Sequence, residues 1–397
     1  MKYCHRPFDF LYLDNSEGDV YLCPWMEPSL GPIGNILEND VETVWKGEKA
    51  ENLRNLFREN YFMHCRPQGC PHVQNHDLPE ISDEEEFQRL TVTQDRPKTI
   101  NLAYDSVCNQ SCETCRKKVF IPPPDYKEKV NIIRERISPY INTAEELTAS
   151  GHGDPFASPY MMDLLAGLNP SNPKMRVLLE TNGVFFDEKH WERIEHLGKY
   201  NISVVLTSNS FNEYTYNLIS RGGMYKKLIQ NLKFIKTLRE SGAINRFVSS
   251  FVIQDRNFRE IPEFIERSLN EFGFDDVVLK PVYQWGTMDE KVFWFKDVLN
   301  PAHPYHQEYL TILKHPLMHD KRVYNFGGES VHPCRDFEIV EEQPCQPEPE
   351  VLPILLPPLE VPEMGRKQKL KKGIKLCASA VLGKNLCAKL KKFLHRG

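Results

Sequence analysis

The sequence of 397 residues has no uninterrupted run of eighteen apolar residues, the length that a membrane-spanning helix needs. Its mean hydropathy is −0.50, which is typical of a protein that folds in water. The first residues, MKYCHRPFDF, lack the basic and then apolar order of a secretory signal peptide. These absences argue against an integral membrane protein and favour a cytoplasmic location.

The sequence also lacks any recognised nucleic-acid-binding motif and any pattern of basic residues interleaved with aromatic ones. We therefore expect no nucleic acid partner. No winged-helix domain of the kind that binds leader peptides is recognisable either, which weakens the case for a peptide substrate without excluding it.

Cysteine is present in unusual number, eleven in all, and the cysteines fall into groups. Disulfides are disfavoured in a reducing cytosol, where clustered cysteines more often serve metals or redox chemistry. The grouping therefore favours metal centres over scattered buried thiols. The groups are Cys4 with Cys23; Cys65 with Cys70; Cys108, Cys112 and Cys115; Cys334 with Cys345, which match no motif; and Cys377 with Cys387.

Strand-like and helix-like segments alternate between residues 96 and 300. This alternation predicts an α/β fold with a parallel sheet and crossover helices, either a barrel or a doubly wound sheet. In both folds, reactive groups gather beyond the carboxyl ends of the strands. The strand-like segments are KTINLAY, EELTAS, MRVLLETNG, NISVVLTSN, NRFVSSFVIQ and DDVVLKPV, with helical patterns such as PYMMDLLAGL and MYKKLIQNLKFIKTLRESG between them.

Shorter segments flank this α/β region. The last of them is a tail with eleven Lys and Arg and no acidic residue, and its apolar residues have helical spacing. Subtracting its charge from the net −5 leaves about −16 on the rest. The tail suits docking at an anionic membrane surface or an acidic partner, or a merely solubilising role. The predicted segments are a loop-rich module with a hairpin turn at Gly18 (1–78), an acidic connector (79–95), the α/β region (96–300), a C-terminal extension (301–342), a Pro-rich linker (343–363) and the basic tail (364–397).

Three cysteines occupy eight positions in the segment Cys108–Asn–Gln–Ser–Cys112–Glu–Thr–Cys115, after the first predicted strand. A structural zinc site is closed by a fourth ligand, for which the distant His152 is a candidate. A [4Fe–4S] cluster can instead keep one iron free for an external ligand. The C-x3-C-x2-C spacing and its position resemble the signature of the radical SAM superfamily, although Thr114 stands where an aromatic residue is usual.

Later motifs occur in the order that this resemblance implies. SGHGDPF follows the second strand, ETNG ends the third, and LTSN ends the fourth, with Asn209 in place of the usual acid. The resemblance covers about residues 96–300 and implies a partial (β/α)6 TIM-type barrel. It also implies a set of residues that contact S-adenosylmethionine (SAM), namely Gly151, Gly153, Asp154, Thr181, Asn182, Thr207 and Arg221.

The front module contains a second set of four cysteines: Cys4, Cys23, Cys65 and Cys70. Four thiolates make a closed site for either Zn²⁺ or a [4Fe–4S] cluster. The pattern of Cys, hairpin, Cys, IGNI, Trp and a closing Cys pair resembles a SPASM segment, which usually follows the barrel. The resemblance places the chain in the SPASM/twitch branch and implies an auxiliary [4Fe–4S] cluster.

The resemblance implies reductive cleavage of SAM to a 5′-deoxyadenosyl radical, which abstracts hydrogen from a substrate. The substrate is expected to be a ribosomal peptide or protein, or alternatively a sugar or other small molecule. A flavodoxin or ferredoxin is the expected electron donor. A hypothesis of another class is a non-enzymatic zinc or iron–sulfur scaffold that binds a partner through its basic tail.

Overall fold

The computed structural model describes residues 1–66, 70–74, 76–149 and 152–326. All of them belong to one compact unit, Met1–Phe337. The predicted linker and basic tail lie outside the described residues, as do Gly151, the pair Cys334 and Cys345, and the tail cysteines. Among the helices described, none combines the length and the apolar character needed to cross a bilayer.

A single sheet of ten strands organises the fold, in the order β10-β9-β8-β7-β6-β5-β4-β1-β2-β3. From β4 to β10, neighbours in the sheet follow the order of the sequence and pair in parallel. The predicted α/β fold with six parallel strands is thereby confirmed, as a partial barrel. These strands are β4 (Thr99–Leu102), β5 (Glu146–Ala149), β6 (Arg176–Thr181), β7 (Asn201–Thr207), β8 (Arg246–Ile253), β9 (Asp276–Pro281) and the additional β10 (Val323–Asn325).

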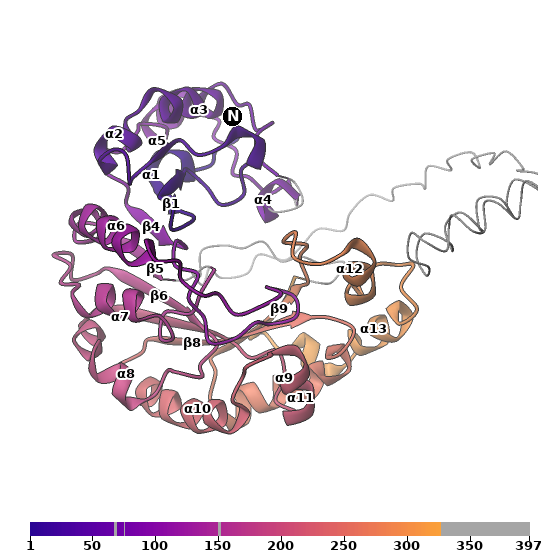
Figure 1. The fold of residues 1–397 in the computed structure, drawn as a ribbon. Helices are drawn as coiled ribbons and strands as arrows, with labels where there is room; N and C mark the ends of the chain where they lie inside the picture. The colour runs from indigo at the N-terminus through magenta and orange to yellow at the C-terminus, as the bar shows by residue number, and fades with distance from the viewer. Residues whose placement is uncertain (67–69, 75, 150–151, 327–397) are drawn as a thin grey trace, which may run out of the picture. The chain divides into compact units, whose positions relative to one another are not determined.

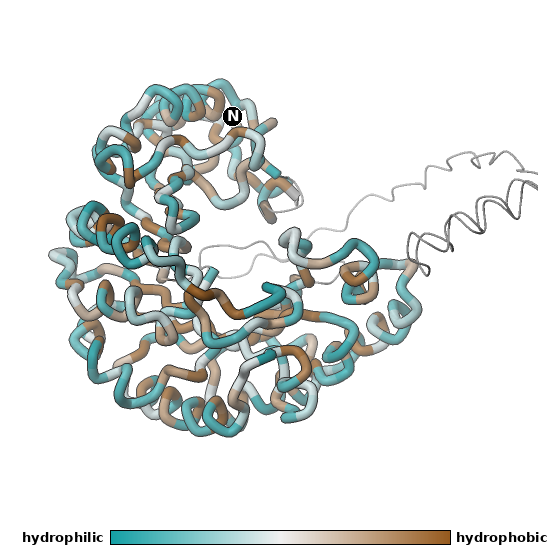
Figure 2. Tube along the Cα trace, viewed as in Figure 1, coloured by the Kyte–Doolittle hydropathy of each residue, from teal (hydrophilic) through white to brown (hydrophobic). Residues whose placement is uncertain are grey.

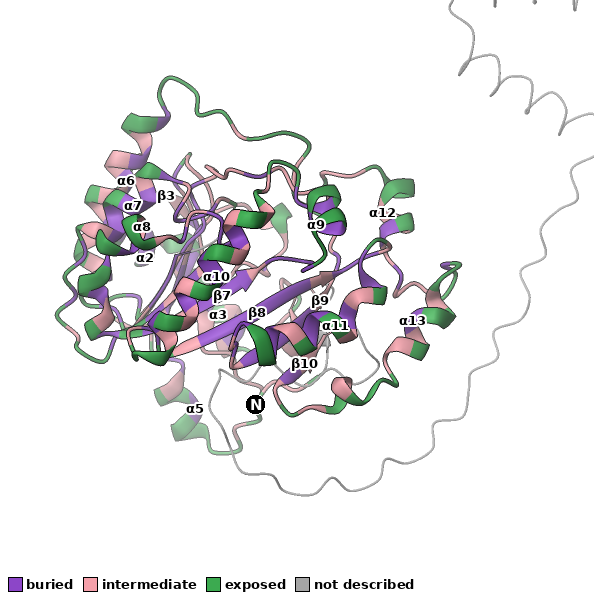
Figure 3. Ribbon diagram, turned by 90° about the horizontal axis from the view of Figure 1, so that it is seen from below, coloured by how far each residue is buried: buried purple, intermediate pink, exposed green. Residues whose placement is uncertain are grey.

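Helices cover the outer face of these parallel strands (Figure 1). Buried strand residues such as Val177, Val204 and Phe247 share one apolar core with helix residues such as Ile133 and Leu232. Hydrophobic residues follow the strands and the inner sides of the helices (Figure 2), and the outward helix surfaces are exposed (Figure 3). The helices are α6 (Tyr126–Ile141), which the sequence analysis missed, α7 (Pro159–Ala166), α8 (Glu188–Glu192), α9 (Glu213–Ile219), α10 (Tyr225–Glu240), α11 (Ile261–Glu266) and α13 (His306–Ile312). The remaining helix of this region, α12 (Glu290–Lys296), lies at the carboxyl ends of the strands, where Lys296 contacts Asp255 just after β8.

The other face of the strands carries a second, smaller apolar cluster around Val205, Val248 and Val278. These residues alternate along their strands with residues of the main core, so they point to the opposite, concave side of the sheet. The concave side is the inside of the partial barrel, and it is apolar at this level.

The front module contains the predicted hairpin. Strands β1 and β2 pair antiparallel, with Tyr12 opposite Tyr21, and Gly18 turns the chain between them with φ +85°. Two helices, α2 and α3, follow the hairpin, and Gly47 lies between them, outside both. The elements are α1 (Arg6–Asp9), β1 (Phe10–Leu13), β2 (Asp19–Tyr21), β3 (Gly34–Asn35), α2 (Val41–Trp45), α3 (Glu48–Arg58), α4 (Pro71–Gln74) and, within the predicted connector, α5 (Glu84–Leu90).

The hairpin continues the barrel sheet. Strand β1 pairs in parallel with β4, so that Phe10 to Leu13 lie opposite Thr99 to Leu102. An unpaired edge on the first barrel strand would expose its backbone N–H and C=O groups. The front module covers that edge, a connection that the sequence analysis did not predict.

Candidate functional site

The loop after β4 carries Cys108, Cys112 and Cys115, and we call residues 104–117 the cysteine loop. Its backbone is tied to the turn after α9: the Ser111 N–H donates to the Arg221 carbonyl at 2.8 Å. The Arg221 guanidinium donates in return to the carbonyls of Ser111 and Arg116, both at 2.8 Å. Arg221, predicted as a SAM contact, therefore also holds the cysteine loop in place.

The glycine that follows Arg221 allows this close approach. Gly222 has φ +82°, and a Cβ there would lie 2.9 Å from the Asn109 carbonyl oxygen. A larger residue would be strained and would also push the cysteine loop away.

Polar groups surround the sulfur atoms of the cysteine loop. The Cys108 sulfur accepts from the Gln110 N–H at 3.4 Å and the Asn182 amide at 3.7 Å, and the Cys112 thiol donates to Gln110 Oε1 at 3.2 Å. Burial raises the pKa of Cys108 to about 12, with a smaller effect from Asp154. Burial and the Cys115 thiol raise the pKa of Cys112 to about 11. These thiols are protonated at neutral pH, so a bound metal would have to displace their protons.

No three His, Cys, Asp or Glu side chains within the described ranges converge as a finished metal site. The cysteine loop nevertheless has the donors that iron–sulfur chemistry uses, three soft thiols on one loop. The residues present therefore fit a [4Fe–4S] cluster, and their role as its ligands stays a prediction.

A buried ion-pair network supports the cysteine loop. Glu113, between Cys112 and Cys115, pairs with Lys296 at the end of α12 at 2.9 Å. The Lys296 ammonium also contacts Asp255, just after β8, at 3.0 Å, and its side chain is 4% exposed. Arg256 approaches Glu113 at 3.3 Å. The network ties the cysteine loop to the end of β8 and to α12.

The Gly-rich loop after β5 packs directly against the cysteine loop. A Cβ on Gly153 would lie 2.5 Å from the carbonyl oxygens of Asp105 and Val107. The two backbones meet here, so only glycine fits. Gly153 thus has a packing role beside its predicted role near SAM.

Asp154 joins the ends of two neighbouring strands. Its Oδ2 accepts from the Asn182 N–H at 2.7 Å and the Thr181 hydroxyl at 2.8 Å, and its Oδ1 accepts from the N–H groups of Phe156 and Ala157. Burial raises the pKa of the Asp154 carboxyl, and these donors partly offset the effect. Both carboxylate oxygens are engaged by protein groups that fix the predicted SAM-binding turns.

The ends of β6 and β7 carry the remaining predicted SAM contacts. The Asn182 side-chain amide donates to Asn109 Oδ1 at 2.9 Å, which links the turn after β6 to the cysteine loop. Thr207 is the last residue of β7 and half-buried. Asn209 has φ +61°, and its Oδ1 accepts from the Val252 N–H at 2.8 Å, so it bridges β7 and β8. Asparagine tolerates this left-handed conformation better than most residues do.

His152, the candidate fourth ligand of the zinc hypothesis, contacts the front module instead. Its Nε2 lies 3.2 Å from Asp14 Oδ1, immediately after β1. This contact joins the Gly-rich loop to the hairpin and leaves the three cysteines without a histidine from this position.

The front module brings its four cysteines together through short backbone pairings. Met26 and Cys65 form an antiparallel bridge, which places the segment after Cys23 beside Cys65. The Cys70 N–H then donates to the Arg66 carbonyl at 2.9 Å. Burial, followed by the thiols of Cys4, Cys23 and Cys70, raises the pKa of Cys65. The other three thiols therefore lie within electrostatic range of Cys65. By their chemistry, the four thiols together fit an iron–sulfur or zinc site.

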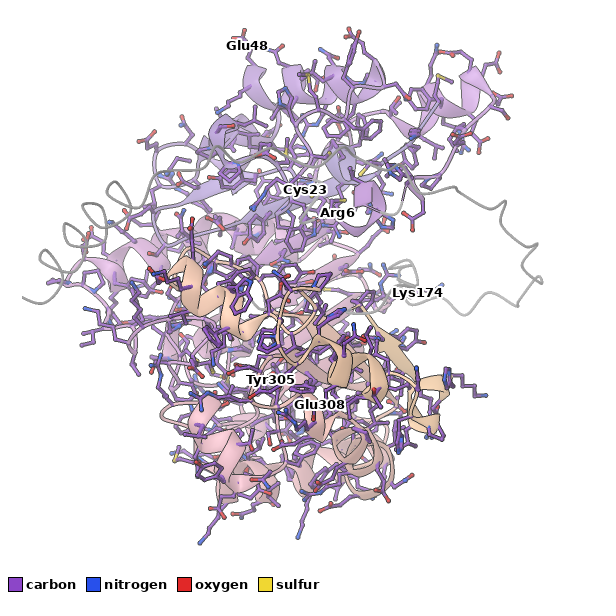
Figure 4. The ribbon with its side chains drawn as sticks, turned by 90° about the vertical axis from the view of Figure 1, so that its right-hand side faces the viewer. Arg6, Cys23, Glu48, Lys174, Tyr305 and Glu308 are labelled. Carbon is purple, nitrogen blue, oxygen red and sulfur yellow. The ribbon has the colours of Figure 1, made fainter. Side chains whose placement is uncertain are left out.

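Arg6 lies beside Cys23 (Figure 4). Its Nη1 donates to the Cys23 sulfur at 3.7 Å, and its guanidinium stacks over the Phe10 ring at 5.0 Å. The Trp25 N–H donates to the same sulfur at 3.5 Å.

Sequence comparison agrees with this arrangement of two sites. The family described as the radical SAM superfamily matches residues 106–267, and the SPASM family, described as an iron–sulfur cluster-binding domain, matches residues 4–71. The chain therefore contains a radical SAM domain and a SPASM domain. Its radical SAM domain implies a [4Fe–4S] cluster and SAM, and its SPASM domain, which precedes the barrel, implies a second iron–sulfur cluster.

No curated protein matches the sequence significantly. Among solved structures, SuiB from Streptococcus suis has 12% identity and a TM-score of 0.38, over 72% of this chain and 63% of SuiB. The structure titled "Native anSMEcpe with bound AdoMet and Cp18Cys peptide" has 16% identity and a TM-score of 0.34, over 54% of this chain and 60% of that one. HydG, a maturase of the [FeFe]-hydrogenase, has 13% identity and a TM-score of 0.32, over 50% of this chain and 46% of HydG. The chain thus spans less than two thirds of the length of each of these proteins.

Sequence reasoning missed several residues that shape the site. Lys296, Gln110 and Tyr216 act through partners far along the chain; the Gln110 amide, for example, donates to the Tyr216 hydroxyl at 2.9 Å. No local motif marks such residues. The one available signal was Glu113, a charge inside a C-x2-C segment that needs a partner once buried.

Proposed function

We propose that this radical SAM protein is an enzyme that cleaves SAM reductively and uses the product to abstract hydrogen from its substrate. Cys108, Cys112 and Cys115 would hold the catalytic [4Fe–4S] cluster. The observation that carries this proposal is three thiols on one loop at the carboxyl end of the first barrel strand, within the matched radical SAM domain. The Asp14 contact of His152 supports it, because His152 is thereby directed away from closing a zinc site.

The residues around the cysteine loop have positioning roles in this proposal. Arg221 and Gly222 fix the loop against α9, and the Lys296 network fixes it against β8. The apolar cluster on the concave side of the sheet restricts water at that level of the barrel. With the cluster and SAM bound, the site supplies one-electron cleavage of the sulfonium and hydrogen abstraction.

The front module would hold an auxiliary [4Fe–4S] cluster through Cys4, Cys23, Cys65 and Cys70. We assign this role to residues 1–78 and SAM chemistry to residues 96–300, with 79–95 as the connector. The gathered thiols and the SPASM match support this division. A small electron-transfer protein, such as a flavodoxin or ferredoxin, would reduce the catalytic cluster.

A segment of a peptide or protein is the substrate class that we favour. Exposed aromatic side chains follow the carboxyl ends of two barrel strands: Tyr214 (74% exposed) after β7, and Trp285 (56%) and Phe295 (58%) after β9. Aromatic side chains exposed near a site suit contact with an extended, partly apolar ligand.

The test is anaerobic reconstitution followed by addition of dithionite and SAM. We expect a brown protein that releases 5′-deoxyadenosine and methionine. The triple variant Cys108→Ala, Cys112→Ala, Cys115→Ala should lose this release and retain the iron of the front module, about four atoms per chain. A wild-type chain that binds only zinc, or clusters that release no 5′-deoxyadenosine, would overturn the proposal.

A further inference from the structure

Arg6 is a cation whose side chain contacts a sulfur atom and an aromatic ring. Within the part of the chain that the structure describes, its guanidinium forms no ion pair with a carboxylate. It donates to the Cys23 sulfur at 3.7 Å and packs over the Phe10 ring at 5.0 Å.

A backbone N–H group adds to the positive potential at the same sulfur atom. The Trp25 N–H donates to the Cys23 sulfur at 3.5 Å. Cys23 therefore receives two donors, one from the Arg6 side chain and one from the Trp25 backbone.

The cysteine loop of the barrel is built differently. Its sulfur atoms receive neutral donors, the Gln110 N–H and the Asn182 amide. The nearest arginine in sequence, Arg116, donates to the Ser106 carbonyl at 2.8 Å and acts on Cys108 and Cys112 only through its charge. Among the described residues, a guanidinium donates directly to a cysteine sulfur in the front set and not in the barrel set.

We propose that Arg6 raises the reduction potential of the auxiliary cluster, an inference that rests on the proposed function of the front module. A [4Fe–4S] cluster held by four thiolates gains one negative charge when it is reduced. A partly buried cation in contact with a ligand sulfur favours the more negative state, and hydrogen bonds to the sulfurs act in the same direction. Arg6 thereby suits the auxiliary cluster to accept an electron rather than only to support the fold.

The test measures the midpoint potential of the auxiliary cluster by anaerobic redox titration with EPR detection. The background is the full chain with Cys108, Cys112 and Cys115 changed to Ala, so that only the front cluster contributes. Arg6→Gln and Arg6→Met remove the charge, and Arg6→Lys keeps it. Arg89→Gln is the matched control, because it removes an arginine of α5 whose side chain is 75% exposed.

We expect Arg6→Gln and Arg6→Met to lower the midpoint potential, Arg6→Lys to lower it less, and Arg89→Gln to leave it unchanged, all at equal iron content. Equal potentials in all four would overturn the inference and leave the front cluster itself established. Loss of iron from both uncharged variants, with Arg6→Lys loaded, would assign Arg6 to cluster assembly and overturn the redox role. A background protein that holds zinc and no iron would overturn the auxiliary-cluster proposal and this inference with it.

Discussion

Lys296 carries an almost completely buried positive charge next to the cysteine loop. Its ammonium lies between Glu113 and Asp255. Removing one partner from a buried ion pair leaves uncompensated charge, which costs about 3–5 kcal/mol. We therefore expect Lys296→Met to lower the free energy of unfolding by about that amount in anaerobic urea titration, and to reduce bound iron.

The control for this variant is Lys291→Met, at an exposed position on the same helix. It should change the free energy of unfolding by less than about 0.5 kcal/mol. Adding Glu113→Gln and Asp255→Asn to Lys296→Met should recover part of the loss, since the unpaired charges are then gone. Equal stability of Lys291→Met and Lys296→Met would show that the network does not support the loop.

Asp154 is the second residue with a defined structural role. It accepts four hydrogen bonds, two at each carboxylate oxygen. In Asp154→Asn, an NH2 group replaces one of these oxygens and faces two donors instead of accepting from them. A buried donor left unpaired costs about 1–3 kcal/mol, and we expect that loss in urea unfolding. Asp163→Asn, on the exposed side of α7, should be nearly neutral. If the two variants lose the same stability, the carboxylate does not join β5 to β6 as described.

At the residue scale, the sequence identified motifs and not their partners. Gly153, Asp154 and Arg221 were singled out as SAM contacts, and that role stays a prediction. Their contacts with the cysteine loop could not be predicted, because each joins segments about 45 to 110 residues apart. Only the folded sheet brings such segments to the same edge.

Among the elements, the pairing of β1 with β4 was the least predictable. Period-two alternation indicated a hairpin, and the β–α alternation indicated six parallel strands, and both predictions are confirmed. Neither pattern predicts which strands are neighbours in the sheet, because the sequence of a strand that is buried on both faces does not specify its neighbour. Helix α6 was missed.

The β1–β4 pairing predicts that the barrel depends on the front module. A chain that begins at residue 79 would leave β4 as an uncovered edge strand with free N–H and C=O groups, and such edges pair with other chains. We expect this truncated protein to elute from a size-exclusion column as large species, whereas the full chain does not.

A milder variant separates the edge effect from loss of the cysteines. Changing Cys4, Cys23, Cys65 and Cys70 to Ala removes the proposed ligands and keeps β1. If that variant elutes like the wild type while the truncated chain aggregates, the strand protects the barrel. If the truncated chain is also monodisperse, β4 needs no cover and the prediction is wrong.

For the whole molecule, the two sites should be separable in function. Cys65→Ala with Cys70→Ala removes half of the front ligands and leaves the cysteine loop intact. We expect 5′-deoxyadenosine release to persist and product formation to fail, as measured by chromatography once a substrate is known. Normal turnover of substrate by this variant would limit the front module to a structural role.

The contrast in charge between the tail and the remainder gives the other prediction at this scale. The tail carries eleven Lys and Arg, and each basic residue near an anionic surface contributes about 1 kcal/mol to binding. We expect the full chain to sediment with vesicles of anionic lipid and a chain lacking residues 364–397 to remain in the supernatant. Binding should weaken with added salt, and equal sedimentation of both chains would exclude a membrane role for the tail.

The order of the strands has a consequence for synthesis on the ribosome. From β4 to β10, each strand pairs with the one made just before it, and β1 is made before all of them. Because chains emerge amino end first, β1 is available as a template when β4 appears, and each later strand finds its neighbour already exposed. A SPASM domain ahead of the barrel therefore lets this sheet grow in one direction during translation, because each new barrel strand finds an earlier strand already made.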